Sequence, residues 1–180
     1  MFLEACRARC CTGAATTRPA PLPALVRLWH VLSVVNVVLY QPEIPQNAGN
    51  IARTCAATSS SLHLVRPLGF RWASPQMKRA GLDYWERAEV HLHDSWDIFV
   101  KTLPEDARVF ALSSKAKKSY TGIQYQPNDY LLFGPETRGL PPEILEHFPA
   151  ITIPMPGKVR SLNLAVSVGV VVFEALRQFR

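Results

Sequence analysis

Apolar residues near the carboxyl end of the chain recur at the spacing of a helix. Five of them fall at i, i+4, i+7, i+8 and i+11, namely Leu164, Val168, Val171, Val172 and Ala175. This spacing predicts one long helix over residues 164–179. A buried strand is the alternative, because valine favours strands and the run is dense in it. The length and spacing favour a helix, and one so apolar on all sides is expected to be buried on several of them.

Upstream, short apolar runs alternate with amphipathic segments. Residues 34–40 form an apolar run of strand length, which is typical of a fully buried strand. Further strands are predicted at residues 62–65, 90–92, 108–112, 130–133 and 150–153. Helices are predicted at residues 46–57, 75–80, 96–103 and 141–147, and residues 115–125 are expected to form an exposed connection. Strands that alternate with helices predict an α/β domain whose mostly parallel sheet is flanked by helices.

The first 33 residues differ from the rest of the chain. They are rich in alanine, arginine, cysteine and proline, and they show no clear periodicity. We interpret residues 1–33 as an N-terminal extension that is disordered, a targeting segment or a mis-annotated start, and residues 34–180 as one domain. An organelle transit peptide is one alternative, because the segment is rich in arginine and poor in acidic residues. A cytoplasmic location is the favoured interpretation.

Composition narrows the function classes only modestly. Hydrophobic residues make up 48% of the chain, which excludes general disorder, and the net charge of +6 permits a nucleic-acid partner without requiring one. No apolar run approaches the roughly 20 residues of a membrane span. No cysteine and histidine spacing matches a zinc site, so no metal is expected. His91 and His93 are interpreted as surface residues.

The first motif with candidate chemistry is the segment PQNAGNIART at residues 45–54. Asn47 is expected to cap the helix that begins there, since its side chain can accept from free backbone amides. Asn50 and Arg53 are three residues apart and are therefore neighbours on one helix face. The planar guanidinium of Arg53 could bind phosphate or a sugar. Taken alone, the motif fits a capped helix with one exposed arginine.

Two further motifs lie at predicted strand ends. The segment LLFGPETRGLP at residues 131–141 brings Gly134, Glu136 and Arg138 to the carboxyl end of a strand, where ligands bind in open α/β sheets. Gly134 would allow a ligand to approach the backbone closely.

The third motif is the loop at residues 153–163. It places Lys158, Ser161 and Asn163 beside the start of the long helix, where Ser161 or Asn163 can cap the first turn. A helix start also attracts anionic ligands. An ordinary loop and cap is the simpler interpretation of this segment alone.

Together, in this order, the three motifs resemble the SPOUT superfamily of RNA methyltransferases. The resemblance covers residues 35–177 and is supported by AGLDYW at residues 80–85, FAL at 110–112 and RSLNL at 160–164. Within the superfamily, the chain is most similar to the small 2'-O-methyltransferases of the tRNA wobble nucleotide, the TrmL type. The motifs are specific jointly and weak singly.

The resemblance implies an α/β domain with a C-terminal trefoil knot that binds S-adenosylmethionine. The cofactor would contact backbone groups at Leu112, Gly134, Ile153 and Ser161. The catalytic positions would be Arg53, Asn47, Glu136 and Asn163, with Ser161 nearby. The enzyme would be a homodimer that joins through its C-terminal helix, with active sites at the subunit interface. The sequence leaves open whether Arg53 acts within its own chain or across the dimer.

The implied reaction is methylation of the ribose 2'-oxygen at tRNA position 34, a cytidine or a modified uridine. Methyl transfer from a sulfonium needs no metal. We expect the anticodon stem-loop of the tRNA to be bound electrostatically by four basic residues, Lys78, Arg79, Arg138 and Lys158. The alternatives are methylation of another RNA, such as ribosomal RNA, and a non-catalytic RNA-binding protein that has kept the fold.

Overall fold

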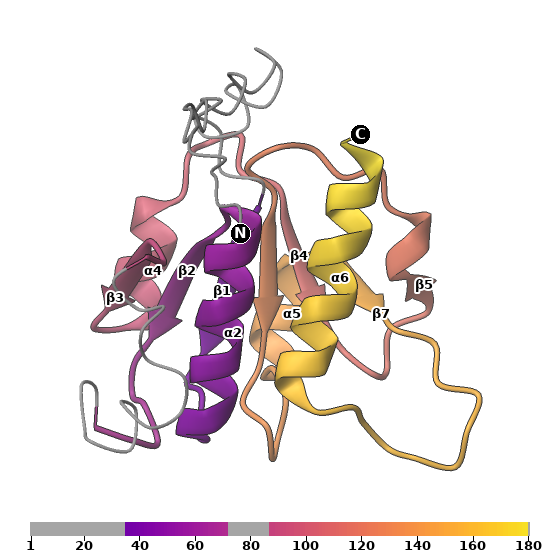
Figure 1. Ribbon diagram of the computed structural model, residues 1–180. Helices are drawn as coiled ribbons and strands as arrows, with labels where there is room; N and C mark the ends of the chain where they lie inside the picture. The colour runs from indigo at the N-terminus through magenta and orange to yellow at the C-terminus, as the bar shows by residue number, and fades with distance from the viewer. Residues whose placement is uncertain (1–34, 72–86, 180) are drawn as a thin grey trace, which may run out of the picture.

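A seven-stranded parallel sheet organises the computed structural model, which describes residues 35–71 and 87–179 (Figure 1). The strand order is β3-β2-β1-β6-β4-β7-β5, and every paired strand runs parallel to its neighbour. The strands are β1 (Asn36–Tyr40), β2 (Ser61–Val65), β3 (Val90–His93), β4 (Val109–Leu112), β5 (Lys118–Ser119), β6 (Tyr130–Phe133) and β7 (Ala150–Thr152).

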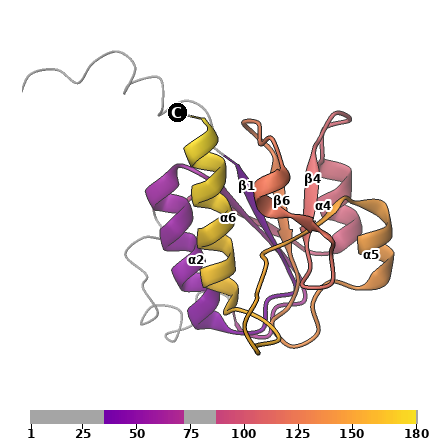
Figure 2. The same cartoon turned by 90° about the vertical axis from the view of Figure 1, so that its right-hand side faces the viewer.

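Helices cover both faces of this sheet. Helices α2 (Pro45–Thr58) and α6 (Leu164–Gln178) lie side by side on one face, and α4 (Trp96–Thr102) and α5 (Pro142–His147) lie on the other (Figure 2). A short 3-10 helix, η2 (Tyr120–Gly122), follows β5.

Each face of the sheet has its own apolar core, because successive side chains of a strand point to opposite sides. Val37 and Leu39 of β1 pack in the core under α2 and α6, whereas Val38 packs in the core under α4 and α5. In β6, Leu131 belongs to the first core and Leu132 to the second. Strands buried on both faces read as continuous apolar runs, which explains why β1 and β6 stand out in the sequence.

The predicted α/β class and parallel sheet are confirmed, as are the strands and helices that fall within the described residues. The predicted helix at residues 75–80 and the extension at residues 1–33 lie outside the described residues. The trefoil knot stays a prediction. No helix in the described part of the chain is long and apolar enough to cross a membrane.

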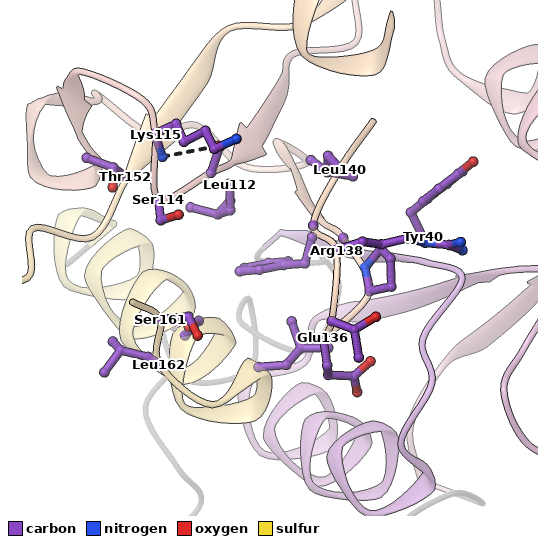
Figure 3. A pocket seen from close by; sticks show the side chains of 18 of the residues that line it. Tyr40, Leu112, Ser114, Lys115, Glu136, Arg138, Leu140, Thr152, Ser161 and Leu162 are labelled. Atoms are coloured by element: carbon purple, nitrogen blue, oxygen red, sulfur yellow. Dashed lines mark hydrogen bonds between the residues drawn. The ribbon is translucent and has the colours of Figure 1, made fainter. Parts of the chain in front are cut away.

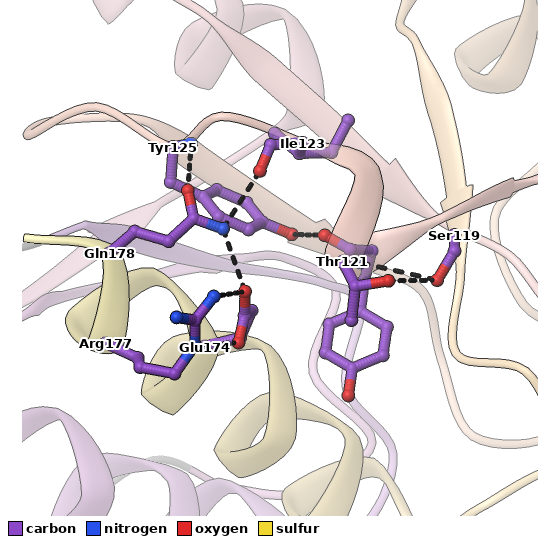
Figure 4. A network of polar contacts seen from close by, with 8 residues as sticks. Ser119, Thr121, Ile123, Tyr125, Glu174, Arg177 and Gln178 are labelled. Atoms are coloured by element: carbon purple, nitrogen blue, oxygen red, sulfur yellow. Dashed lines mark hydrogen bonds and ion pairs between the residues drawn. The ribbon is translucent and has the colours of Figure 1, made fainter.

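The expectation of an exposed connection at residues 115–125 was only partly right, because several of these residues are exposed but the segment also contains a strand and two buried side chains. Lys118 and Ser119 pair with β7, and Ile123 and Tyr125 are buried in the core under α6. The amide side chain of Gln178 secures this segment, since it accepts from the Tyr125 backbone N–H at 3.0 Å and donates to the Ile123 carbonyl at 3.0 Å (Figure 4). A side chain 53 residues further along the chain therefore orders the segment, and no local pattern reveals it.

Helix α6 is buried along one stripe, which corrects the expectation that several of its sides would be covered. Val168, Val171 and Ala175 are fully buried, but Phe173 keeps 58% and Val166 keeps 53% of its surface exposed. The sheet and α2 cover only one side of α6 within the single chain. A homodimer through this helix stays a prediction.

His93 was also misassigned to the surface. Because β2 and β3 pair in register, His63, His91 and His93 meet on the face that α4 covers. Nδ1 of His63 lies 3.0 Å from Nε2 of His93, and the rings of His63 and His91 stack at 4.7 Å. Burial is the main cause that lowers the pKa of His63 to about 3, and the charges that His91 and His93 would carry contribute to the same shift. Within the described residues, no group of three or more histidine, cysteine or acidic side chains is arranged to hold a metal ion.

We predict that this histidine cluster makes the fold sensitive to acid. The folded pKa of His63 lies below the ordinary 6.5, so between those values the unfolded chain binds more protons and stability falls as pH drops. Thermal unfolding measured from pH 7 to pH 5 should show a smaller loss of Tm for His63→Gln than for the parent protein. His147→Gln on α5, an exposed change, should leave the slope unaltered. Equal slopes for His63→Gln and the parent would contradict this account.

Candidate active site

A pocket with a volume of about 1390 Å³ lies at the carboxyl edge of the sheet. Loops that follow β1, β4, β6 and β7 line it, together with the first residues of α6 (Figure 3). Ligands of open α/β sheets bind at this edge. Eight of the predicted site residues line the pocket: Asn47, Leu112, Gly134, Glu136, Arg138, Ile153, Ser161 and Asn163.

The carboxylate of Glu136 is bound at the start of α2. It accepts from the backbone N–H of Glu43 at 2.8 Å, from that of Ile44 at 3.2 Å and from Nδ2 of Asn47 at 2.9 Å. The amides at a helix start lack partners within the helix and carry partial positive charge, so a carboxylate is stabilised there. A side chain from the loop after β6 thus takes the role of a cap for α2.

This arrangement corrects the expected role of Asn47. The N-cap residue of α2 is Ile44, which forms no side-chain cap, and Pro45 occupies the first turn. Asn47 therefore lies inside the helix, where only 5% of its surface is exposed. Its side chain points to other loops instead of capping its own helix.

A hydrogen bond between Asn47 and Asn163 joins the motif at residues 45–54 to the loop at residues 153–163. Nδ2 of Asn163 donates to Oδ1 of Asn47 at 2.9 Å. Oδ1 of Asn163 also accepts from the backbone N–H of Ala165 at 2.9 Å, which confirms Asn163 as the N-cap of α6. A continuous hydrogen-bonded chain thus runs from Glu136 through Asn47 to Asn163 and links residues 116 positions apart.

A second set of contacts fixes the loops after β1 and β6 to each other. Glu43 accepts from the backbone N–H of Thr137 at 3.2 Å and from its hydroxyl at 2.9 Å, while Arg138 donates to Oε1 of Gln41 at 2.6 Å. Sequence reasoning missed Gln41, Glu43 and Thr137. Only the adjacency of β1 and β6 in the sheet brings them together, and that order is not visible in the sequence.

Gly134 is required by the loop itself, and its expected role of admitting a ligand stays a prediction. A Cβ atom at this position would lie 2.4 Å from the carbonyl carbon of Gly139 and 2.4 Å from the backbone nitrogen of Leu140. The chain turns back on Gly134 through Gly139, whose φ of +71° is a left-handed conformation that favours glycine.

The predicted cations divide between the pocket and other places. Arg138 lines the pocket, whereas Arg53 on α2 and Lys158 are exposed and are not among the described residues that line it. Lys78 and Arg79 lie outside the described residues. Lys115 also lines the pocket and was not selected from the sequence, although its position directly after β4 was a usable signal.

We predict that Gly134→Ala destabilises the fold and disturbs the pocket. The added methyl group would meet backbone atoms that cannot rotate away, and such overpacking costs about 1–3 kcal/mol. Gly157→Ala is the matched control, because a Cβ there has no neighbour within 4 Å. Chemical denaturation of both variants measures the difference. Equal stability of the two would show that the loop at Gly134 is looser than its backbone contacts indicate.

The chain is thus an α/β domain with a parallel sheet, and hydrogen-bonded loops line a pocket at the carboxyl edge of that sheet. The sequence model of the SpoU rRNA Methylase family matches residues 34–173, and the chain belongs to that family. The resemblance to RNA methyltransferases drawn from the sequence motifs is therefore confirmed.

Individual relatives are similar over the same region. A tRNA (cytidine(34)-2'-O)-methyltransferase of Yersinia pestis is 50% identical over 152 residues, which cover 81% of this chain and 94% of the relative. A solved structure described as "Structural insights into the 2-OH methylation of C/U34 on tRNA" is 59% identical to this chain and has a TM-score of 0.79. The match covers 81% of this chain and 95% of the other chain.

A more distant structure was solved with a ligand. The AdoMet-bound rRNA methyltransferase of Sinorhizobium meliloti is 26% identical with a TM-score of 0.72, and the match covers 81% of this chain and 57% of that one. Its S-adenosylmethionine is a property of that protein.

Proposed function

We propose that this protein transfers a methyl group from S-adenosylmethionine to the ribose 2'-hydroxyl of tRNA position 34, a cytidine or a modified uridine. The observation that carries the proposal is the Glu136–Asn47–Asn163 chain, which ties three separate motifs around one pocket. It gains weight from the 50% identity to the Yersinia pestis tRNA (cytidine(34)-2'-O)-methyltransferase.

The pocket fits the cofactor in size and lining. Its volume of about 1390 Å³ exceeds the roughly 300–1,000 Å³ of ordinary small-molecule sites and leaves room for a nucleotide beside a cofactor. The four residues expected to hold S-adenosylmethionine all line it, namely Leu112, Gly134, Ile153 and Ser161. Apolar side chains suit a flat base, and loop backbone groups suit the polar parts.

The cofactor would supply a methyl group on a sulfonium, and the chain's own residues must orient and activate the ribose. A 2'-hydroxyl is a poor nucleophile unless its proton is removed or its developing charge is stabilised. Arginine stays protonated in proteins, so we assign Arg53 to orientation of the ribose and stabilisation of the developing alkoxide. Glu136, Asn47 and Asn163 hold the surrounding loops and are positioning residues in this scheme.

A homodimer through α6 would complete the site. The exposed Phe173 and Val166 give that helix an apolar face that is uncovered in the single chain. Arg53 is not among the described residues that line the pocket of its own chain, which supports the proposal that it serves the site of the partner.

Incubation of the full chain with methyl-labelled S-adenosylmethionine tests the proposal, with bulk tRNA and ribosomal RNA in parallel reactions. We expect label in tRNA, and mapping should place it on the 2'-oxygen of nucleotide 34. Label in ribosomal RNA alone would favour the second candidate, which the name of the matched family suggests. Cofactor-dependent RNA binding without any transfer would instead indicate a non-catalytic protein.

We predict that Arg53→Ala retains cofactor binding but lowers kcat for methyl transfer by about 100-fold or more. The interaction would matter mainly in the transition state, so turnover falls more than ground-state binding. Arg53→Lys is the matched variant, because it keeps the charge and loses the planar fork, and it should remain impaired. Calorimetry for the cofactor and single-turnover kinetics separate the two effects. Unchanged turnover in the alanine variant would remove Arg53 from the active site.

A further inference from the structure

A run of lysines connects the main pocket with a second, smaller one. Lys115 lines the main pocket directly after β4. Three residues later, Lys118 in β5 lines a pocket of about 410 Å³, with Lys117 lying between them. All three lysines are exposed, and the segment at residues 115–119 contains no acidic residue.

The backbone holds these lysines in fixed positions. Ser113 accepts from the backbone N–H of Ala116 at 3.2 Å, which closes a turn at the rim of the main pocket. Lys118 then pairs with Ile151 of β7, at the edge of the sheet. Cations on an ordered backbone bind phosphates at a lower entropic cost than cations on a loose loop.

The three lysines also differ from several arginines of the chain in their ion pairs. Arg66, Arg108 and Arg177 each form an ion pair with a carboxylate. Among the described residues, no carboxylate forms an ion pair with Lys115, Lys117 or Lys118. Their charge is therefore available to a partner from solution.

The second pocket has the features of a nucleotide subsite. Arg108 is held on three sides, since Nε lies 3.2 Å from Asp129, the guanidinium donates to the Gln124 carbonyl at 2.8 Å, and its carbon lies 5.3 Å from the centre of the Phe110 ring. About a third of the Arg108 side chain stays exposed (34%). A fixed guanidinium plane is a surface on which an unpaired base can stack.

We propose that Lys115, Lys117, Lys118 and the pocket at Arg108 form a track for the RNA strand that flanks the target nucleotide. The phosphates would contact the lysines, and one flanking base would stack on Arg108. This inference rests on the proposed function, because the main pocket must hold the ribose from which the strand leaves. It adds a binding surface on the β5 edge of the sheet, built from residues other than the four cations expected from the sequence.

Salt-dependent tRNA binding by Lys117→Ala and Lys118→Ala tests the track. Neither residue lines the main pocket, and both are exposed, so folding and cofactor affinity should match the parent. Each variant should bind tRNA several-fold more weakly, and the slope of log K against log salt should become shallower by about 0.7–0.9. Lys101→Ala is the matched control, since it removes the same charge from α4, beside the opposite edge of the sheet (Figure 1).

The outcomes separate this inference from the proposed function. Slopes and affinities equal to those of Lys101→Ala would overturn the track, even if the parent protein methylates position 34. Failure of the parent to methylate any tRNA, combined with the expected loss of affinity in the two lysine variants, would overturn the proposed function and leave the lysines as an RNA-binding surface without a target nucleotide beside it. A parent protein that binds no RNA would overturn both.

Discussion

The site depends on one carboxylate at one helix start. Glu136 comes from the loop after β6, yet it accepts from the backbone amides of Glu43 and Ile44, just before α2, and from the side chain of Asn47. A carboxylate is stabilised there by unpaired N–H groups and by the partial positive charge of the helix. Since Asn47 in turn accepts from the N-cap of α6, the two long helices and the pocket share a single hydrogen-bonded connection.

Parallel strand order makes that connection attainable. β1 and β6 are neighbours in the sheet although about 90 residues separate them, so their carboxyl ends present the two loops side by side. The close return of the chain over Gly134 then lets Glu136 reach α2, because any larger residue would push Gly139 and Leu140 outward. The position of Glu136 in the pocket thus follows from the pairing of β1 with β6 and from the close backbone packing at Gly134.

The sequence was informative where a signal is local. Continuous apolar runs predicted β1 and β6, the spacing of Leu164 to Ala175 predicted α6, and Asn163 was among the two candidate caps. The sequence-based predictions failed where a residue far along the chain determines the local structure. From the sequence alone Asn47 looks like a helix cap, but in the fold its side chain binds Glu136 from the loop after β6. The segment near Tyr125 likewise looks like an exposed loop, but the side chain of Gln178 binds it. The three motifs taken together predicted the family, whereas the spacing within any one of them could not have done so.

Two features of the single chain would have one common explanation. Phe173 and Val166 leave an apolar face of α6 exposed, and exposed apolar surface of this kind is costly in water. Arg53 lies on α2, which packs beside α6, yet it is not among the described residues that line the pocket of its own chain. A second copy that docks on α6 would cover the apolar face and bring a second α2 close to the pocket. Burial of that face would then also bring Arg53 of one chain toward the pocket of the other, so dimer stability and the proposed activity would be coupled through the same helix.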